Sequence, residues 1–237
     1  MGLLLLLCGQ ASADPAAESS QLVTVRGHGW NDRAAELQRW ERREREWVRV
    51  GKPIAVVLGG HGLGWGAGLV TPSVEAGEPR KREGDLRSPA GLFRLGTVTG
   101  YAPTAPPSAT LPYRVASDDK LRCVDDAKAP EYNQLADAPA SGSTTWHSDE
   151  KMHRTDGLYE LTIFVEHNAD RKAGHGSCIF LHIWRSAGAG TAGCTAMPRA
   201  DLFTLVSWLK ADAHPLLLQA PAAAWDRLAV AAGIKLP

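Results

Sequence analysis

Glycine and proline interrupt this chain so often that few segments are long enough for a regular helix. The 237 residues include 24 glycines and 15 prolines. Between them lie short runs rich in valine, isoleucine and leucine, which are typical of β-strands. Glycine and proline favour turns because glycine tolerates positive φ and proline fixes φ. The sequence therefore predicts a mainly β fold with few helices rather than a helical bundle.

The predicted elements form one β-rich α+β domain over residues 21–237. The predicted strands are 22–27, a hairpin within 47–60, 156–168, 176–184 and 214–221. Two helices are predicted. The first covers the charged residues 34–47, with Asp32 as its cap. The second covers residues 197–212, where apolar side chains repeat at helical spacing, namely Leu202, Leu205, Val206 and Leu209.

The first residues have the pattern of a secretory signal peptide. An apolar run at residues 3–7 precedes Ala-Ser-Ala at 11–13, which is typical of a cleavage site. We therefore expect residues 1–13 to be a signal peptide, residues 14–20 to be a linker, and the protein to be exported to the periplasm or cell envelope. The alternative is a disordered apolar N-terminus. No later run reaches the ~18 apolar residues that a membrane-spanning helix needs.

Cleavage after residue 13 would leave three cysteines, Cys123, Cys178 and Cys194. In an oxidising compartment an odd number of cysteines leaves one thiol unpaired. One disulfide plus one reactive thiol is the expected arrangement, and with Cys194 as the reactive thiol the predicted pair is Cys123 and Cys178.

The charges are balanced, with 26 Lys and Arg against 26 Asp and Glu. Nucleic-acid binding usually needs an excess of basic residues, because they neutralise the phosphates. We therefore expect no nucleic-acid partner.

His182 and Cys194 carry the strongest chemical signal. His182 lies near the end of a predicted strand, and Cys194 follows a glycine-rich return centred on Gly188. A symmetric antiparallel return would place the two side chains opposite each other, with β-carbons roughly 4.5–5.5 Å apart. An imidazole beside a thiol is the usual arrangement of a cysteine nucleophile and its base. The N–H groups of Gly193 and Cys194 would then bind the developing oxyanion.

Two other interpretations of these residues were weighed. A histidine or a cysteine on an apolar strand is often only a packed core residue. A zinc site is the second possibility, because His175, Cys178, His182 and Cys194 lie close in sequence. However, Cys178 and His182 would lie about 13 Å apart along one strand, too far for one metal ion to bridge. We therefore expect no metal.

Two segments, in order, resemble the signature of the YkuD-type L,D-transpeptidases. That signature is a His, a glycine-rich stretch and then Ser/Thr-x-Gly-Cys, and its positions here are His182, Thr191, Gly193 and Cys194. Upstream, residues 81–96 are similar to the family segment Lys-x-Glu-Gly-Asp-Gly-x-Ser/Thr-Pro-x-Gly. The matching residues are Glu83, Gly84, Asp85, Ser88, Pro89 and Gly91.

The resemblance implies a single L,D-transpeptidase-like β-sandwich or barrel domain with a helix after Cys194. It implies peptidoglycan stem peptides as substrates: Cys194 attacks an amide carbonyl next to a D-centre and releases D-Ala. An amine, including one on a wall-attached protein, would then accept the acyl group, and no cofactor is needed. Ala192 stands where the family often has His, and Ile183 follows His182 where Gly is frequent, so the chain resembles a divergent branch.

Two further functions stay open at this point. The same Cys–His site would serve an L,D-carboxypeptidase or amide hydrolase that uses water as acceptor. A non-catalytic cell-wall-binding domain is the other alternative, and an unreactive, buried Cys194 would favour it. His61 and His167 are additional candidates for a place in the cleft, although a glycine-rich turn explains His61 equally well.

Overall fold

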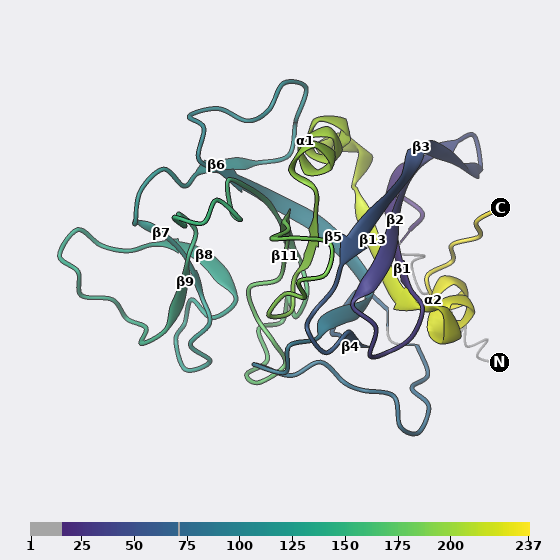
Figure 1. The fold of residues 1–237 in the computed structure, drawn as a ribbon, viewed down its shortest axis with the longest axis horizontal. Helices are drawn as coiled ribbons and strands as arrows, with labels where there is room; N and C mark the ends of the chain where they lie inside the picture. The colour runs from purple at the N-terminus through teal and green to yellow at the C-terminus, as the bar shows by residue number, and fades with distance from the viewer. Residues whose placement is uncertain (1–15, 71) are drawn as a thin grey trace, which may run out of the picture.

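The computed structural model describes residues 16–70 and 72–237, and within them strands far outnumber helices (Figure 1). This confirms the mainly β fold with few helices. The proposed signal peptide at 1–13 lies outside the described residues. Of the linker, Ala16 and Ser19 are buried against the domain. No helix of the described ranges is long and apolar enough to cross a membrane.

The largest sheet closes on itself to form a barrel. Its order is β10-β11-β12-β3-β2-β1-β13-β5-β4, and β10 also pairs with β5, which completes the ring. The short strand β6 pairs with β5 outside the ring. The bounds of these strands are β1 Gln21–Gly27, β2 Ala34–Arg43, β3 Glu46–Val57, β4 Leu63–Trp65, β5 Ser88–Gly100, β6 Tyr113–Val115, β10 Leu161–Val165, β11 Phe180–Ile183, β12 Thr195–Met197 and β13 Leu216–Pro221.

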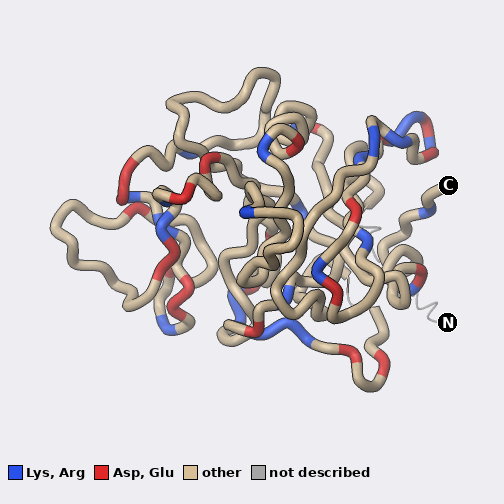
Figure 2. Tube along the Cα trace, viewed as in Figure 1, with Lys and Arg blue, Asp and Glu red and all other residues tan. Residues whose placement is uncertain are grey.

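The predicted helix over residues 34–47 is wrong, because this segment forms β2 and the start of β3. The two strands are antiparallel neighbours, and β2 also pairs with β1. Arginine side chains lie over tryptophan rings across the hairpin, with Arg42 4.6 Å from Trp47 and Arg49 5.3 Å from Trp40. Basic and acidic residues are interspersed along this hairpin (Figure 2). Cross-strand packing therefore overrides the helix propensity of the charged residues.

The predicted hairpin within 47–60 is also wrong, because β3 runs through this segment as one strand. Instead of a turn, this segment has an irregularity in its pairing with β2, between Leu37 and Arg39. Gly51 has a φ of 68°, a conformation that glycine adopts without strain. The extra residues of β3 are accommodated at this point without ending the strand.

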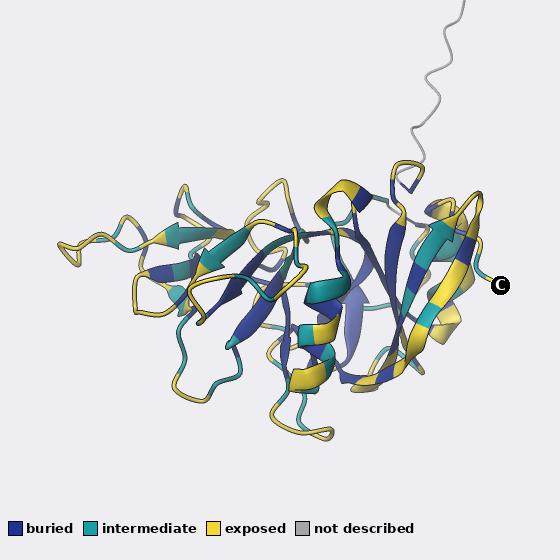
Figure 3. Ribbon diagram, turned by 90° about the horizontal axis from the view of Figure 1, so that it is seen from above, coloured by how far each residue is buried: buried dark blue, intermediate teal, exposed yellow. Residues whose placement is uncertain are grey.

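A three-stranded sheet lies beside the barrel, in the order β8-β7-β9 (Figure 1). Its strands are β7 Leu121–Val124, β8 Gln134–Asp137 and β9 Asp149–Lys151. Buried segments fill the barrel, while the loops of the small sheet are largely exposed (Figure 3). A separate apolar cluster joins the two sheets and consists of Ala116, Leu121, Cys123, Met152, Tyr159, Cys178, Phe180 and Cys194. We call this set the junction cluster.

The helices follow the strands that carry the candidate site. The helix α1, Arg199–Trp208, begins after Pro198 and packs against β10 and β11, which confirms the helix predicted after Cys194. Its buried side chains are Leu202, Leu205 and Val206. The short 3-10 turn Ala211–Ala213 precedes β13 in the chain. A second 3-10 turn, Ala222–Ala224, and the helix α2, Trp225–Ala231, follow it.

Candidate functional site

Cys194 lies immediately before β12, beside the strand that carries His182. The two strands are parallel, with Leu181 opposite Thr195 and His182 opposite Ala196. The expected antiparallel return about Gly188 is therefore wrong. The glycine-rich connection runs back along β11 before β12 begins, as parallel strands require. His182 and Cys194 are consequently diagonal neighbours instead of a directly facing pair.

The sulfur of Cys194 contacts backbone groups at the start of β11 and in the segment just before it. The N–H of Phe180 donates a hydrogen bond to Sγ over 3.2 Å, and Sγ lies 3.7 Å from the carbonyl oxygen of Cys178, to which the thiol can donate. Cys194 is only 6% exposed, and its burial raises the pKa of the thiol to about 12. The resting residue is therefore a neutral thiol.

His182 is oriented by its own strand. Its Nδ1 lies 2.8 Å from the carbonyl oxygen of Ile183, which can only accept, so Nδ1 carries the hydrogen and Nε2 has the free lone pair. Burial lowers the pKa of His182 to about 4, which keeps the ring neutral. A neutral imidazole with a free lone pair is the form that acts as a base.

His182 and Cys194 line one cleft of about 310 Å³. No hydrogen bond joins them directly in the part of the chain that the structure describes. A second hollow of about 250 Å³ continues from this cleft and shares four lining residues with it, Glu150, Tyr159, His182 and Ala192. His182 therefore borders both hollows, whereas Cys194 lines only the first.

The loop before Cys194 is fixed by hydroxyl groups. Thr191 Oγ1 donates to the carbonyl oxygen of Cys194 over 2.5 Å, and Ser88 Oγ donates to the same oxygen over 2.7 Å. The N–H of Gly193 donates to Thr191 Oγ1, so this group, expected at the oxyanion, is engaged within the loop. Gly193 has a φ of 152°, which other residues rarely adopt. Ala192 lines the cleft.

The upstream motif at residues 81–96 supports the loop that precedes Cys194. Lys81 Nζ forms an ion pair of 2.6 Å with Asp85 Oδ1, and both side chains are largely buried. The two oxygens of Asp85 also accept from the backbone N–H groups of Arg82 and Arg87. Asp85 thus fixes the turn that leads into Ser88, and Lys81 lines the cleft.

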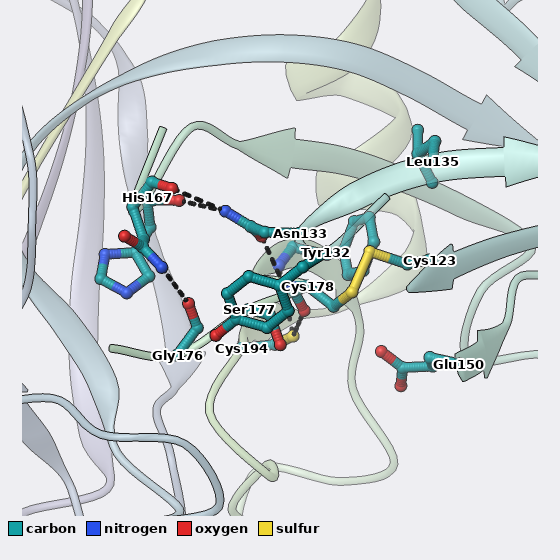
Figure 4. The surroundings of a disulfide bond; sticks show 12 residues. Cys123, Tyr132, Asn133, Leu135, Glu150, His167, Gly176, Ser177, Cys178 and Cys194 are labelled. Atoms are coloured by element: carbon teal, nitrogen blue, oxygen red, sulfur yellow. Dashed lines mark hydrogen bonds between the residues drawn. A yellow bond between two sulfur atoms is a disulfide. The ribbon is translucent and has the colours of Figure 1, made fainter. Parts of the chain in front are cut away.

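The predicted disulfide between Cys123 and Cys178 is confirmed (Figure 4). It links β7 of the small sheet to the segment before β11. The N–H of Cys178 donates to Oδ1 of Asn133, and its carbonyl faces the Cys194 thiol. A disulfide sulfur has no thiolate to offer a metal, so Cys178 is unavailable to the zinc site considered above.

The other two candidate histidines lie away from the Cys194 cleft. His61 is exposed, and its Nδ1 lies 3.0 Å from the carbonyl oxygen of Asp85. His167 is buried against Phe93, and its Nε2 lies 2.9 Å from the carbonyl oxygen of His175. His167 lines a separate hollow of about 390 Å³ together with Arg114 and other residues. Neither ring lines the two hollows beside His182.

Two residues that line both hollows were not predicted from the sequence. Tyr159 packs its ring on His182 at 5.1 Å between centroids, and its hydroxyl donates to Glu150 over 2.5 Å. Glu150 belongs to β9 of the small sheet, and Tyr159 precedes β10 of the barrel. The only available signal was an aromatic residue two positions before the apolar run 161–165, which by itself indicates packing.

Comparison with known proteins adds no identification. No protein-family model, curated protein or solved structure matches this chain. The chemical interpretation therefore rests on the arrangement of its own residues and on the two motifs of the sequence.

Proposed function

We propose that this protein is a cysteine-dependent acyltransferase of the peptidoglycan L,D-transpeptidase type. The observation that carries the proposal is the placement of Cys194 and a neutral His182 in one cleft, below a loop that matches Thr-x-Gly-Cys. Peptidoglycan stem peptides are the proposed substrates, following the motif resemblance. An amine of another stem peptide or of a wall-attached protein is the proposed acceptor.

The reaction proceeds in two acyl transfers. The Cys194 thiol loses its proton to Nε2 of His182, and Sγ forms a bond to the amide carbonyl carbon. The carbon–nitrogen bond then breaks, and the leaving amine takes the proton from His182. The acceptor amine attacks the thioester, and Cys194 regains a proton as its sulfur leaves. Water in place of the amine would make the same site a hydrolase.

An exported location is part of the proposal. The disulfide between Cys123 and Cys178 supports it, because structural disulfides persist in oxidising compartments such as the periplasm. The signal-peptide pattern at residues 1–13 supports it from the sequence.

The burial of Cys194 favours a second candidate, a non-catalytic domain that binds the cell wall. A thiol that is 6% exposed and has a raised pKa is a poor nucleophile until substrate or motion changes its surroundings. The two candidates differ in whether a covalent intermediate forms.

The test is intact mass spectrometry of the protein incubated with a purified tetrapeptide donor, with and without an added amine. An acyltransferase gains the acyl mass on Cys194 and loses it faster when the amine is present. The Cys194→Ser variant is the matched control and should gain no thioester. Binding to peptidoglycan without any covalent mass would refute the proposal and favour the wall-binding domain.

A further inference from the structure

Cys178 has a left-handed backbone conformation beside the sulfur of Cys194. Its φ is 53°, a value that residues other than glycine, asparagine and aspartate rarely adopt. Its carbonyl oxygen lies 3.7 Å from Cys194 Sγ, where it accepts the thiol hydrogen. Such a conformation persists only where the surrounding structure fixes it from several sides. The contacts that fix Cys178 therefore also fix an acceptor for the thiol of the proposed nucleophile.

Two groups hold Cys178 in this conformation. The disulfide attaches its side chain to Cys123 on β7. Asn133 holds its backbone, because Oδ1 of Asn133 accepts a hydrogen bond from the Cys178 N–H over 2.9 Å. Figure 4 shows the Asn133 side chain between Cys178 and the segment that contains His167. The position of the Cys178 peptide groups therefore depends on one asparagine amide as well as on the disulfide.

The side chain of Asn133 is itself fixed at its other end. It is buried, and its Nδ2 donates to the carbonyl oxygens of His167 and Asn168 over 2.8 and 3.0 Å. The backbone of Asn133 has a φ of 58°, and its N–H donates to the carbonyl oxygen of Val124 at the end of β7. An amide held in this way at both ends has little freedom to move, and neither has the Cys178 N–H that it binds.

The sulfur of Cys194 thus has one backbone donor and one backbone acceptor. The Phe180 N–H donates to it over 3.2 Å, and the Cys178 carbonyl accepts from it. A carbonyl oxygen can only accept, so it stabilises the protonated sulfur and disfavours a thiolate. The thiol hydrogen then points at Cys178 instead of at Nε2 of His182, in line with the absence of a direct hydrogen bond between the two side chains among the described residues.

We infer that Asn133 is a positioning residue, which holds the Cys178 carbonyl against the Cys194 thiol and so keeps the proposed nucleophile protonated at rest. The inference rests on the proposed role of Cys194 and adds a control on its ionisation. In the first acyl transfer the thiol hydrogen leaves this carbonyl, and the proton passes from Sγ to Nε2 of His182. The imidazole becomes positive and the sulfur negative, while Cys178 and Asn133 gain and lose no proton.

Asn168 is a matched control for this side chain. It is buried and has a φ of 52°, and it also makes three side-chain hydrogen bonds. Its Nδ2 donates to the carbonyl oxygens of Lys172 and Gly176, and its Oδ1 accepts from the Lys172 N–H, so none of the three reaches Cys178. Glycine adopts left-handed conformations without strain. Asn133→Gly and Asn168→Gly therefore remove the same group from the same kind of site, and Asn168→Gly keeps the carbonyl that accepts from Asn133.

The first measurement is the infrared S–H stretching band of Cys194, taken as the difference between the protein and its Cys194→Ser variant. A thiol that donates to a carbonyl absorbs at a lower frequency than an alkanethiol in hydrocarbon solvent, because the hydrogen bond weakens the S–H bond. We expect a lowered band in the wild type and in Asn168→Gly, and a band close to the alkanethiol frequency in Asn133→Gly. A wild-type band at the alkanethiol frequency, an unmoved band in Asn133→Gly, or equal shifts in both variants would overturn the inference.

The second measurement is the rate at which iodoacetamide alkylates Cys194 at one fixed pH, followed by peptide mass mapping. Loss of a hydrogen bond made by the neutral thiol lowers its pKa, so more thiolate is present. We expect Asn133→Gly to react about two- to fivefold faster than the wild type, and Asn168→Gly to stay within about 1.5-fold of it. An unchanged or slower rate in Asn133→Gly contradicts the inference. So does an equal acceleration in both variants, because it would reflect a general loosening of the fold.

Asn133→Asp is a second variant at the same position, and thermal unfolding identifies any variant that does not fold. The carboxyl group keeps an oxygen for the Cys178 N–H and loses the amide donation to His167 and Asn168. We expect its S–H band and its alkylation rate to follow the wild type. A band at the alkanethiol frequency in this variant would overturn the role given to Oδ1.

Failure of this inference differs from failure of the proposed function. If the wild type forms the thioester while its S–H band lies at the alkanethiol frequency, the inference fails alone. If the band depends on Asn133 but no thioester forms, the positioning role is correct and the acyl-transfer proposal is wrong.

Discussion

Removal of the disulfide between Cys123 and Cys178 should strongly destabilise the folded protein. The bond joins residues 55 apart in sequence. For a closed loop of this length, the loss of chain entropy in the unfolded state corresponds to about 4 kcal/mol at 25 °C. The same bond attaches β7 to the segment that contacts Cys194 Sγ, so its loss removes a restraint on the wall of the cleft. We expect the free energy of unfolding to fall by about this amount.

The assay is urea unfolding of the oxidised and the reduced protein, followed by tryptophan fluorescence. With a denaturant slope of about 2 kcal/mol per molar, the midpoint should fall by about 2 M on reduction. The double variant Cys123→Ser, Cys178→Ser is the control, because its midpoint should be low and insensitive to the reductant. A midpoint that shifts by less than about 0.5 M on reduction would refute the loop-entropy reasoning.

Three other outcomes are expected. His182→Ala should keep the fold and slow acylation of Cys194 by about 10²–10⁴-fold, measured by intact mass, and a wild-type rate would remove His182 as the base. Burial lowers the pKa values of His182 and His167 to about 4, so each contributes stability that is complete above pH 6.5 and lost as the pH falls towards 4, about 3 kcal/mol per ring. His167→Gln should weaken this acid dependence in urea titrations, and an unchanged dependence would contradict it. Asp85→Asn leaves the buried Lys81 without its carboxylate and should lower the free energy of unfolding by about 3 kcal/mol, whereas a loss below about 0.5 kcal/mol in the same assay would mean that the ion pair is not needed.

The sequence allowed the fold class and several elements to be predicted. Residues 22–27 and 161–165 read as strands because their β-branched and apolar side chains are buried in the barrel, and the structure places β1 and β10 there. The segment 34–47 could not be assigned correctly, because its charged residues favour a helix locally. Its strand form depends on pairing with β1 and on arginine–tryptophan contacts across the hairpin.

The residues of the candidate site could be predicted in part, but their full geometry could not. The motifs placed His182 and Cys194 together, and the structure brings both to one cleft. Their parallel arrangement depends on the path of the connecting glycines, which sequence spacing does not determine. Tyr159 and Glu150 approach each other only because the small sheet packs on the barrel, so no local sequence pattern could predict their contact.

The hydrogen bond from the Phe180 N–H to Cys194 Sγ has a practical consequence. An amide proton that points directly at the sulfur senses its charge and its covalent state, because both change the electron density at the acceptor. In a ¹⁵N–¹H spectrum the Phe180 resonance should therefore move when the thiol ionises, when it is alkylated and when it carries an acyl group. One backbone signal thus offers a label-free reporter of the nucleophile, without any probe in the cleft.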